Sequence, residues 1–331
     1  MTYEIPGARH HMVDLAGGVT LSVYEVDAVD GDAARPPVVF SHGFPELAFS
    51  WRHQLPAVAA AGFRAVAPDQ RGYGGSSRPD AITDYDIQHL TGDLVELLDA
   101  LDIDKAVFVG HDWGGFVVWQ MPLLHPDRVA GVVGVNTPYV PRLPVRPTDA
   151  FRMVAGDDFY ILEFQEAGVA DEILQRDVPG LFDALFRTAM SPEEMAQAAE
   201  QTPSGPDGLT TFERIIAAPR RGTPLLDDAE MAVYVDTFTR TGFTGGLNWY
   251  RNFDRNWEIT PELDGARIDG VPCLMVTASW DPVLTPAMAQ GMPEIIGDLE
   301  LHELAECGHW TPTERADELD ALLVDWLQKK F

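Results

Sequence analysis

The segment 109–115 constrains the fold of this chain more than any other stretch of its sequence. It reads Val-Gly-His-Asp-Trp-Gly-Gly and places Asp112 between closely spaced glycines, directly after a run of apolar residues. Glycines at this spacing allow a turn tight enough to push the central side chain out above a sheet. We therefore expect a buried strand, a sharp turn at Asp112 and a helix. The alternative is an aspartate that only caps the following helix, a common use of this residue.

Asp112 stands where a serine is usual in a turn of this kind. A carboxylate is already anionic at neutral pH, so it needs no base to become a nucleophile. It acylates amides poorly, but it displaces well at an sp3 carbon that bears a strained or stable leaving group. The residue therefore favours alkyl transfer onto Asp112 over ordinary ester or peptide cleavage.

Apolar runs alternate with helical patterns over much of the chain. After an antiparallel hairpin at 11–27, we expect strands at 38–40, 63–67, 106–109, 129–135, 271–278 and 299–304. A helix is expected from about Thr83, with leucines along one face, and the last helix lies around 319–326. Such alternation implies an α/β fold with a mostly parallel, doubly wound sheet covered on both faces.

The alternation stops between residues 140 and 258. Helical patterns and proline-rich links fill this stretch, and no convincing strand is visible in it. A helical block inserted into a doubly wound sheet lies over the carboxyl ends of the strands, where such sheets bind ligands. We therefore expect a core formed by 1–139 and 259–331, with a helical cap, or lid, at 140–258.

Two later loops at expected strand ends carry an aspartate and a histidine. Asp281 follows the strand that ends at residue 278, and His309 follows the strand that ends at residue 304. The chain order of Asp112, Asp281 and His309 is nucleophile, acid, histidine, which is the order of the α/β-hydrolase triad. This order predicts an α/β-hydrolase fold with a catalytic triad at one edge of the sheet.

A fourth loop, 42–46, reads His-Gly-Phe-Pro-Glu and also follows an expected strand. Backbone N–H groups at such a position can point at a developing oxyanion, and the amides of Phe44 and Trp113 form the natural pair. Taken alone, the segment is also compatible with a plain glycine–proline turn. Its place in the chain favours an oxyanion hole.

The charge and the cysteine content exclude several classes of protein. The chain has 331 residues, a formal net charge of −29 and 46% apolar residues, so it can bury a full core. So negative a chain repels nucleic acid and anionic lipid, and no apolar run could span a bilayer. Cys273 and Cys307 are expected to be buried free thiols. The polar segment 1–14 lacks the pattern of a signal peptide, so a cytoplasmic location is expected.

Three of these segments together resemble a known family. Residues 42–46 (His-Gly-Phe-Pro-Glu), 110–115 (Gly-His-Asp-Trp-Gly-Gly) and 307–311 (Cys-Gly-His-Trp-Thr) look like those of the epoxide hydrolases of the α/β-hydrolase superfamily. The similarity is closest to the hydrolase domain of the soluble epoxide hydrolases, and it runs through nearly the whole chain.

The resemblance extends into the expected lid. The segments 158–166 and 241–252 are similar to the family segments that carry two ring-opening tyrosines, which fall here at Tyr160 and Tyr250. A phenol can donate a hydrogen bond to an opening epoxide without needing acid pH. Away from the resemblance, either tyrosine could equally be an amphipathic residue at an interface between helices.

The resemblance implies a two-step reaction on a small-molecule epoxide. Asp112 attacks an epoxide carbon while Tyr160 and Tyr250 hydrogen-bond the ring oxygen and supply a proton, which leaves an ester on the aspartate. His309, held in its useful tautomer by Asp281, then activates a water that attacks the ester carbon. The product is a vicinal diol, and no metal or organic cofactor is required. A monomer or a homodimer is expected.

Two other functions use the same features. A dehalogenase also attacks from an aspartate at this turn, and the Trp113 indole could hold a halide. However, haloalkane dehalogenases usually have a polar side chain where Phe44 stands, and fluoroacetate dehalogenases typically carry arginine in place of Trp113. A non-catalytic ligand sensor on this fold tends to lose a triad member or the oxyanion turn, and this chain keeps both.

Overall fold

The computed structural model describes residues 3–32, 34–201 and 210–331, so parts of both expected domains lie outside the described residues. Within these ranges the strands form one eight-stranded sheet in the order β1-β2-β4-β3-β5-β6-β7-β8. The strands are β1 (Arg9–Asp14), β2 (Thr20–Val26), β3 (Val38–Ser41), β4 (Ala65–Asp69), β5 (Ala106–His111), β6 (Val129–Val135), β7 (Ile268–Ala278) and β8 (Ile296–Leu304). β1 and β2 pair antiparallel, as do β2 and β4, and every other neighbouring pair is parallel. The expected hairpin and mostly parallel sheet are confirmed.

Some element boundaries differ from the sequence expectation for local reasons. The strand expected at 63–67 begins at Ala65, because the Phe63 N–H still bonds the Val58 carbonyl at the end of the preceding helix. The helix expected from Thr83 begins at Ile87, where the Asp86 carboxylate accepts the His89 N–H as a cap. β8 begins at Ile296, three residues before the expected start, because its first residues already pair with β7, Ile296 with Ile268 and Asp298 with Pro272.

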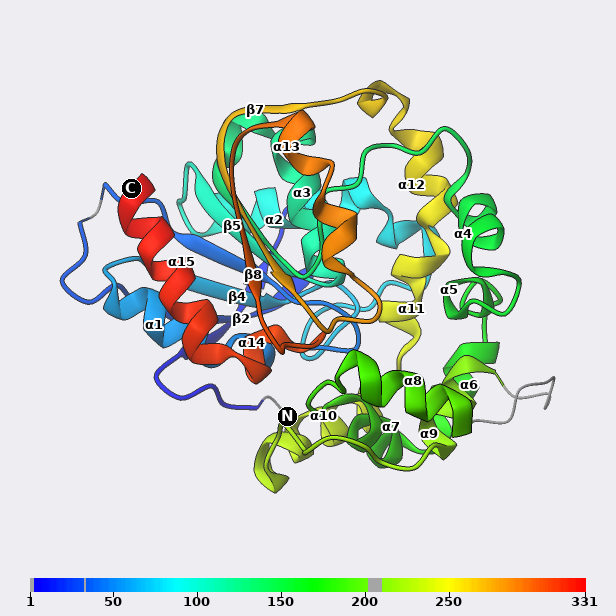
Figure 1. Cartoon of the computed structure of the whole chain (residues 1–331). Coiled ribbons are helices and arrows are strands. Elements are labelled where there is room, and N and C mark those ends of the chain that lie inside the picture. The colour runs from blue at the N-terminus through cyan, green and yellow to red at the C-terminus, as the bar shows by residue number, and fades with distance from the viewer. Residues whose placement is uncertain (1–2, 33, 202–209) are drawn as a thin grey trace.

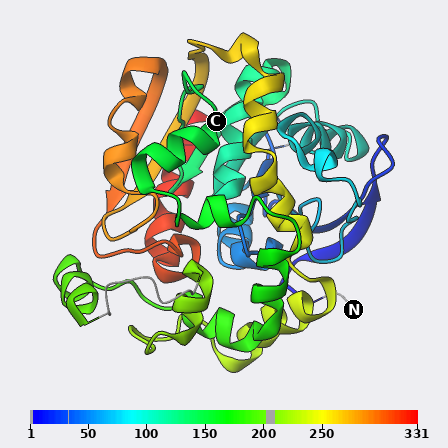
Figure 2. The ribbon, with the colours of Figure 1, turned by 90° about the vertical axis from the view of Figure 1, so that its right-hand side faces the viewer.

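Helices cover both faces of the sheet (Figures 1 and 2). In the core, α1 (Gln54–Ala60) packs against α15 (Ala316–Lys330), and α2 (Ile87–Ala100) packs against α3 (Trp113–Leu124). The shorter helices α13 (Met292–Ile295) and α14 (Thr311–Glu314) follow β7 and β8. Among the helices of the described residues, none combines the length and the apolar character that crossing a bilayer demands.

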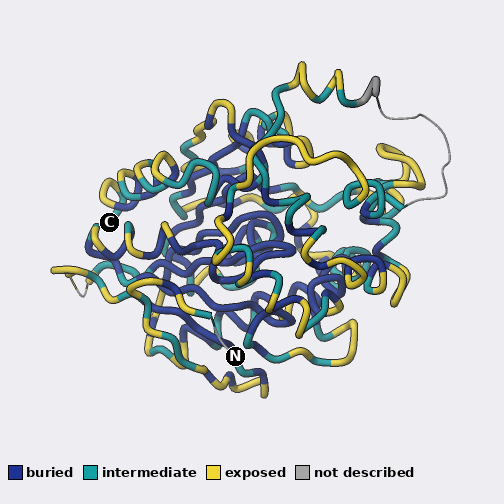
Figure 3. The backbone as a smooth tube through the Cα atoms, turned by 90° about the horizontal axis from the view of Figure 1, so that it is seen from below, coloured by how far each residue is buried: buried dark blue, intermediate teal, exposed yellow. Residues whose placement is uncertain are grey.

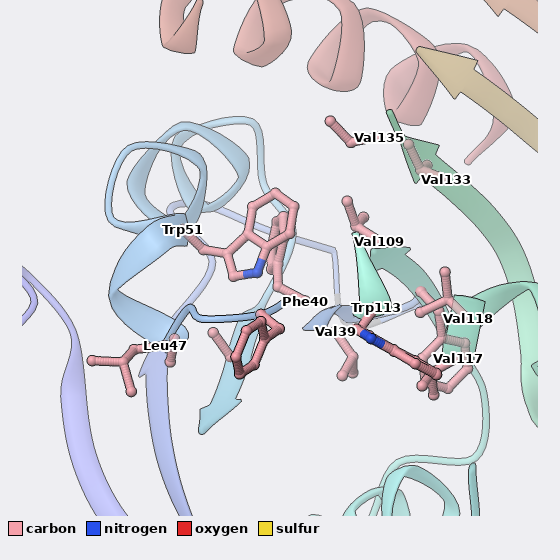
Figure 4. Close-up of a cluster of buried hydrophobic side chains, with 14 of the residues drawn as sticks. Val39, Phe40, Leu47, Trp51, Val109, Trp113, Val117, Val118, Val133 and Val135 are labelled. Carbon is pink, nitrogen blue, oxygen red and sulfur yellow. The ribbon is translucent and has the colours of Figure 1, made fainter. Parts of the chain in front are cut away.

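The centre of the sheet is the hydrophobic core. β3, β5 and β6 are buried along almost their whole length, and Figure 3 shows this interior as a continuous buried layer. Figure 4 shows Val39, Val109 and Val133 from three neighbouring strands together with Val117 from α3 and the Trp113 ring. Each fully buried valine contributes about 1.5–3 kcal/mol of transfer free energy, so these strand ends form a firm base for the loops that follow them.

Between β6 and β7 the described chain is helical. Its helices are α4 (Pro147–Ala155), α5 (Tyr160–Glu163), α6 (Val169–Arg176), α7 (Val178–Leu185), α8 (Pro192–Gln201), α9 (Thr211–Ala217), α10 (Asp228–Thr241), α11 (Thr244–Arg251) and α12 (Phe253–Ile259). An isolated bridge joins Arg187 to Pro224 outside any strand. Figure 1 shows these helices, green to yellow, gathered along the right and lower right of the sheet. Their identification as a separate cap at 140–258 stays a prediction.

Candidate active site

Asp112 occupies a strained turn between β5 and α3. Its backbone has φ 50° and ψ −122°, a conformation that few residues other than glycine adopt, and its side chain makes no cap hydrogen bond to α3. A Cβ on Gly110 would lie 2.3 Å from the Gly114 carbonyl oxygen, and one on Gly114 would lie 1.9 Å from the Ser41 carbonyl oxygen. Glycine is therefore required on both sides of the turn, and the alternative of a simple capping aspartate is wrong.

The two carboxylate oxygens of Asp112 have different surroundings. Oδ1 accepts the Phe44 N–H at 2.7 Å, whereas Oδ2 lies 3.6 Å from His309 Nε2. Burial raises the pKa of Asp112 above its usual value, against the opposing effect of His309, His111 and the backbone N–H groups of Phe44 and Trp113. Of the two amides expected to form an oxyanion hole, that of Phe44 thus bonds this carboxylate. A carboxylate that has lost part of its water shell is a reactive nucleophile.

Gly43 brings the oxyanion loop close to the turn. A Cβ at this position would lie 2.4 Å from both Cβ and Oδ1 of Asp112. Only glycine therefore allows the backbone between β3 and the Phe44 amide to approach the carboxylate so closely.

His309 and Asp281 form a buried pair beside Asp112. His309 Nδ1 lies 2.9 Å from Asp281 Oδ2, and Asp281 Oδ1 accepts the N–H groups of Val283 at 2.9 Å and Leu284 at 3.0 Å. Burial alone would raise the pKa of Asp281, but the charge and hydrogen bond of His309, with these backbone donors, hold it well below its usual range. Asp281 is therefore a permanent carboxylate at neutral pH.

The same pair changes the basicity of His309. Burial alone would lower its pKa, but the negative charges of Asp281, Asp112 and Glu46 raise it to about 9. His309 is consequently protonated at neutral pH while Asp112 carries its charge. The side chains of Asp112 and His309 remain 12% and 16% exposed, so neither is wholly sealed from solvent.

A second buried histidine–carboxylate pair was not foreseen from the sequence. Glu46 Oε2 lies 2.8 Å from His111 Nδ1 and accepts the Gly43 N–H at 2.7 Å, while His111 Nε2 donates to the His309 carbonyl at 2.7 Å. Burial alone would raise the pKa of Glu46, but His111 lowers it to about 2. The pair ties together the loops after β3, β5 and β8. Glu46 lies in the motif at 42–46 and His111 in the motif at 110–115, and this was the only sequence feature that could have pointed to the pair.

Tyr160 and Tyr250 lie close together on the helical side of the site. Tyr160 begins α5 and Tyr250 belongs to α11, and their ring centroids are 6.2 Å apart. The Tyr250 ring packs edge-on against Trp113 at 5.0 Å and Phe44 at 5.3 Å. Tyr250 therefore contacts both residues whose amides were expected to form the oxyanion hole, and Tyr160 lies beside Tyr250.

Both phenols are held in their neutral form. Burial raises the pKa of Tyr160 and of Tyr250 well above the usual value, and in each the negative charge of Asp112 is the next cause. A neutral phenol near a carboxylate can donate a hydrogen bond to an oxygen of a molecule bound between the two groups. The structure thus brings the seven residues singled out in the sequence to one place.

A cavity of about 430 Å³ opens beside His309. On the core side Trp280, His309 and Trp310 line it, and on the helical side Met190 and Ile215 are among the apolar residues that do. Space for a small molecule therefore adjoins the histidine. Among the described residues, no group of three or more histidine, cysteine or acidic side chains is arranged to hold a metal ion.

Comparisons with known proteins agree with this geometry. The alpha/beta hydrolase fold family matches residues 36–316. The chain is 47% identical to epoxide hydrolase A of Mycobacterium tuberculosis, over 94% of each protein. It is 37% identical to bifunctional epoxide hydrolase 2 of Rattus norvegicus over 98% of this chain, and it spans only 54% of that relative's length.

Solved structures give the same result. The structure of epoxide hydrolase A from Mycobacterium thermoresistibile superposes with a TM-score of 0.86 at 46% identity, covering 97% of this chain and 98% of the other. That of the epoxide hydrolase VrEH1 from Vigna radiata has a TM-score of 0.85 at 32% identity, covering 99% of each chain. The similarity therefore covers the sheet and the helical segment between β6 and β7 alike.

Proposed function

Because the chain belongs to the α/β hydrolase fold family and, within it, to the epoxide hydrolases, we propose that it converts an epoxide to a vicinal diol through an ester on Asp112. The observation that carries this proposal is the arrangement of the Asp112 carboxylate. One oxygen accepts a backbone N–H, the other faces His309, and two neutral phenols lie nearby. The Asp112 carboxylate is therefore suited to attack an epoxide carbon, and the resulting ester is suited to hydrolysis by water.

In the first step, Asp112 Oδ2 forms a bond to an epoxide carbon and the carbon–oxygen bond of the ring breaks. The departing oxygen becomes an alkoxide, a very poor leaving group unless a donor stabilises it. Tyr160 and Tyr250 supply hydrogen bonds to that oxygen, and one of them supplies the proton. The product of this step is a hydroxyalkyl ester on Asp112.

In the second step, His309 takes a proton from water, and the water oxygen attacks the ester carbon of Asp112. The amides of Phe44 and Trp113 stabilise the negative charge that develops on Oδ1. The bond between that carbon and Oδ2 then breaks, and the departing oxygen takes up the proton that His309 removed from water. The original Oδ2 therefore leaves in the diol, and the water oxygen remains in the carboxylate.

Ester formation also prepares His309 for this role. The charge on Asp112 is one of the causes that raise the pKa of His309 to about 9, and the ester has no such charge. The pKa of His309 is therefore lower in the ester than in the resting enzyme. After alkylation His309 can therefore give up its proton, which restores the tyrosine that protonated the alkoxide, and the neutral imidazole can act as the base.

We assign the described helices between residues 140 and 258 to a cap that supplies the two phenols. Its contacts with the core include Tyr250 against Phe44 and Trp113, and Arg52 Nε to Glu230 at 2.7 Å. The substrate is a small-molecule epoxide. A cytoplasmic location and a monomeric or homodimeric state remain part of the proposal, and the net charge of −29 supports the absence of nucleic-acid partners.

A single-turnover experiment in heavy-oxygen water tests the proposal. Enzyme in excess over styrene oxide should release diol that is mostly unlabelled, and the label should appear in the peptide that contains Asp112. With substrate in excess, later turnovers should release labelled diol, which serves as the internal control. Fully labelled diol in the first turnover would mean direct attack by water on the epoxide and would overturn the mechanism.

A further inference from the structure

Asn136, the residue directly after β6, contacts two of the loops that form the site. Its side chain is fully buried, and its Nδ2 donates to Asp281 Oδ2 at 2.8 Å and to the Gly308 carbonyl at 3.1 Å. Its backbone N–H bonds the Val276 carbonyl of β7 at 2.8 Å. The residue therefore joins the acid and the segment before His309 to the centre of the sheet.

The orientation of this amide is determined by its neighbours. Asp281 Oδ2 and the Gly308 carbonyl are both acceptors, so only the NH2 group of Asn136 can face them. Within the described residues, the opposite atom, Asn136 Oδ1, is buried without a hydrogen-bond partner. A buried acceptor without a partner is unfavourable. The orientation that leaves Oδ1 without a partner is the one that places the NH2 donor on Asp281.

The backbone at this position restricts which residues can stand there. Asn136 has φ 61°, in the left-handed region that glycine, asparagine and aspartate adopt most readily. Glycine has no side-chain donor, and an aspartate would set a second carboxylate against Asp281. Of the three, only asparagine supplies a neutral donor, so backbone geometry alone does not account for the choice.

We propose that Asn136 is a positioning residue that orients Asp281 toward His309 and occupies the remaining acceptor site on the oxygen that His309 uses. Asp281 Oδ1 is already held by two backbone N–H groups, and Oδ2 accepts from His309 and Asn136. This inference rests on the proposed function for its catalytic consequence, although the contacts themselves do not depend on it.

The donor also weakens the hold of Asp281 on a protonated His309. A hydrogen bond from Asn136 disperses part of the carboxylate charge, so its removal should raise the pKa of His309. The other titratable groups that face the pair are Asp112, Glu46 and His111 around His309, and Tyr160 and Cys307 around Asp281. None of these is changed by a substitution at position 136.

The test compares Asn136→Gly with the unmodified chain, because glycine tolerates the left-handed backbone at this position and removes the side-chain amide. The imidazole of His309 is titrated by nitrogen NMR, with His309→Gln to assign its signal. We expect its pKa to rise by about 0.5–1 unit in Asn136→Gly. In an Asp281→Asn background the same substitution should cause no further rise, since the effect acts through Asp281.

Asn252→Ala is the matched control. Asn252 is also a buried asparagine whose Nδ2 donates to two acceptors, the carbonyls of Ile82 and Asn248, but neither is titratable. The Asn252→Ala variant should lower thermal stability without changing the pKa of His309. Equal pKa values for His309 in Asn136→Gly and the unmodified chain would overturn the proposal, as would an equal rise in the Asp281→Asn background.

Kinetics and the unmodified chain give two further readouts. In Asn136→Gly, hydrolysis of the Asp112 ester should slow about three- to tenfold at pH values below the pKa of His309, while the alkylation rate stays within about twofold of that of the unmodified chain.

If the variant does not fold, the unmodified chain supplies the test. The side-chain NH2 resonances of Asn136 should shift as His309 titrates, and constant resonances would refute the inference. Absence of any Asp112 ester in the unmodified enzyme would instead refute the proposed function, and the NMR titration would still decide the role of Asn136.

Discussion

The two sides of the proposed site are held in place in different ways. In the loops that follow the strands, backbone groups fix the reacting side chains: Phe44 N–H bonds Asp112, and two successive N–H groups bond Asp281. The helices between β6 and β7 hold Tyr160 and Tyr250 mainly by contacts between aromatic rings. Hydrogen bonds to the backbone allow little adjustment, whereas ring packing can rearrange at modest cost.

This contrast indicates which part of the molecule can change its substrate specificity. Asp112, Asp281 and His309 lie in loops at the strand ends. Close backbone contacts, such as that of Gly43 with Asp112, fix the shape of these loops, so the three side chains cannot move without disrupting them. The ring contacts around Tyr160, among them Phe164 at 5.4 Å and Phe212 at 5.9 Å, can accommodate other side chains. We therefore expect the chemistry to depend on the strand-end loops and the choice of epoxide to depend on the helices.

The largest expected effect is that of His309→Gln, which separates the two steps. Ester hydrolysis should fall by about 10³-fold or more, since general-base catalysis is lost, while alkylation continues. Intact mass spectrometry should find an adduct of one epoxide on Asp112, and Asp112→Ala treated in the same way should show none. A folded His309→Gln protein with neither adduct nor turnover would mean that the histidine acts before the ester forms.

The next effect concerns the helical side. Tyr160→Phe and Tyr250→Phe should each slow alkylation of Asp112 by about 10²-fold, and the double variant should be nearly inert. The pre-steady-state alkylation rate is the measurement, because ester hydrolysis can limit turnover. Tyr139→Phe, which changes a buried tyrosine packed beside Trp119, is the control and should leave that rate unchanged. Normal alkylation in the double variant would reopen the dehalogenase alternative, to be checked with haloalkanes.

Two glycine substitutions test the contrast in rigidity directly. Gly114→Ala would place Cβ 1.9 Å from a backbone oxygen of Ser41, whereas Gly246→Ala would place it 2.6 Å from side-chain atoms of Phe44 and Tyr73. We expect Gly114→Ala to destabilise the fold by about 3 kcal/mol or more and Gly246→Ala by about 1–2 kcal/mol, measured by denaturant unfolding. Equal losses would show that the helical side is as rigid as the core.

The last expected effect is the pH dependence of stability that His309 confers. Its pKa is raised from about 6.5 in the unfolded chain to about 9 in the fold, so its contribution is complete below pH 6.5 and is lost as pH rises through 9. The free energy of unfolding should therefore exceed that of His309→Gln by up to about 3 kcal/mol at pH 6, with a difference that shrinks by pH 9.5. A difference that grows with pH would contradict the raised pKa.

Much of the fold could be read from the sequence because it depends on local patterns. Buried parallel strands are short apolar runs, and these located β3, β5, β6 and most of β7 directly. β8 was harder to delimit, since much of it is polar and exposed and pairing with β7 defines its start. The turn at Asp112 was visible because only glycine fits the close contacts on either side of it.

Local sequence patterns were enough to predict the order of the elements, the positions of Asp112, Asp281 and His309 at strand ends, and the helical character of the segment between β6 and β7. Only the folded chain shows which oxygen of Asp112 faces His309, that Glu46 pairs with His111, and that Asn136 donates to Asp281. These contacts could not be predicted because their partners lie far apart along the chain. Turns and strands follow from interactions between neighbouring residues, whereas polar contacts between residues 65 to 197 positions apart exist only after the strands have been brought together in one sheet.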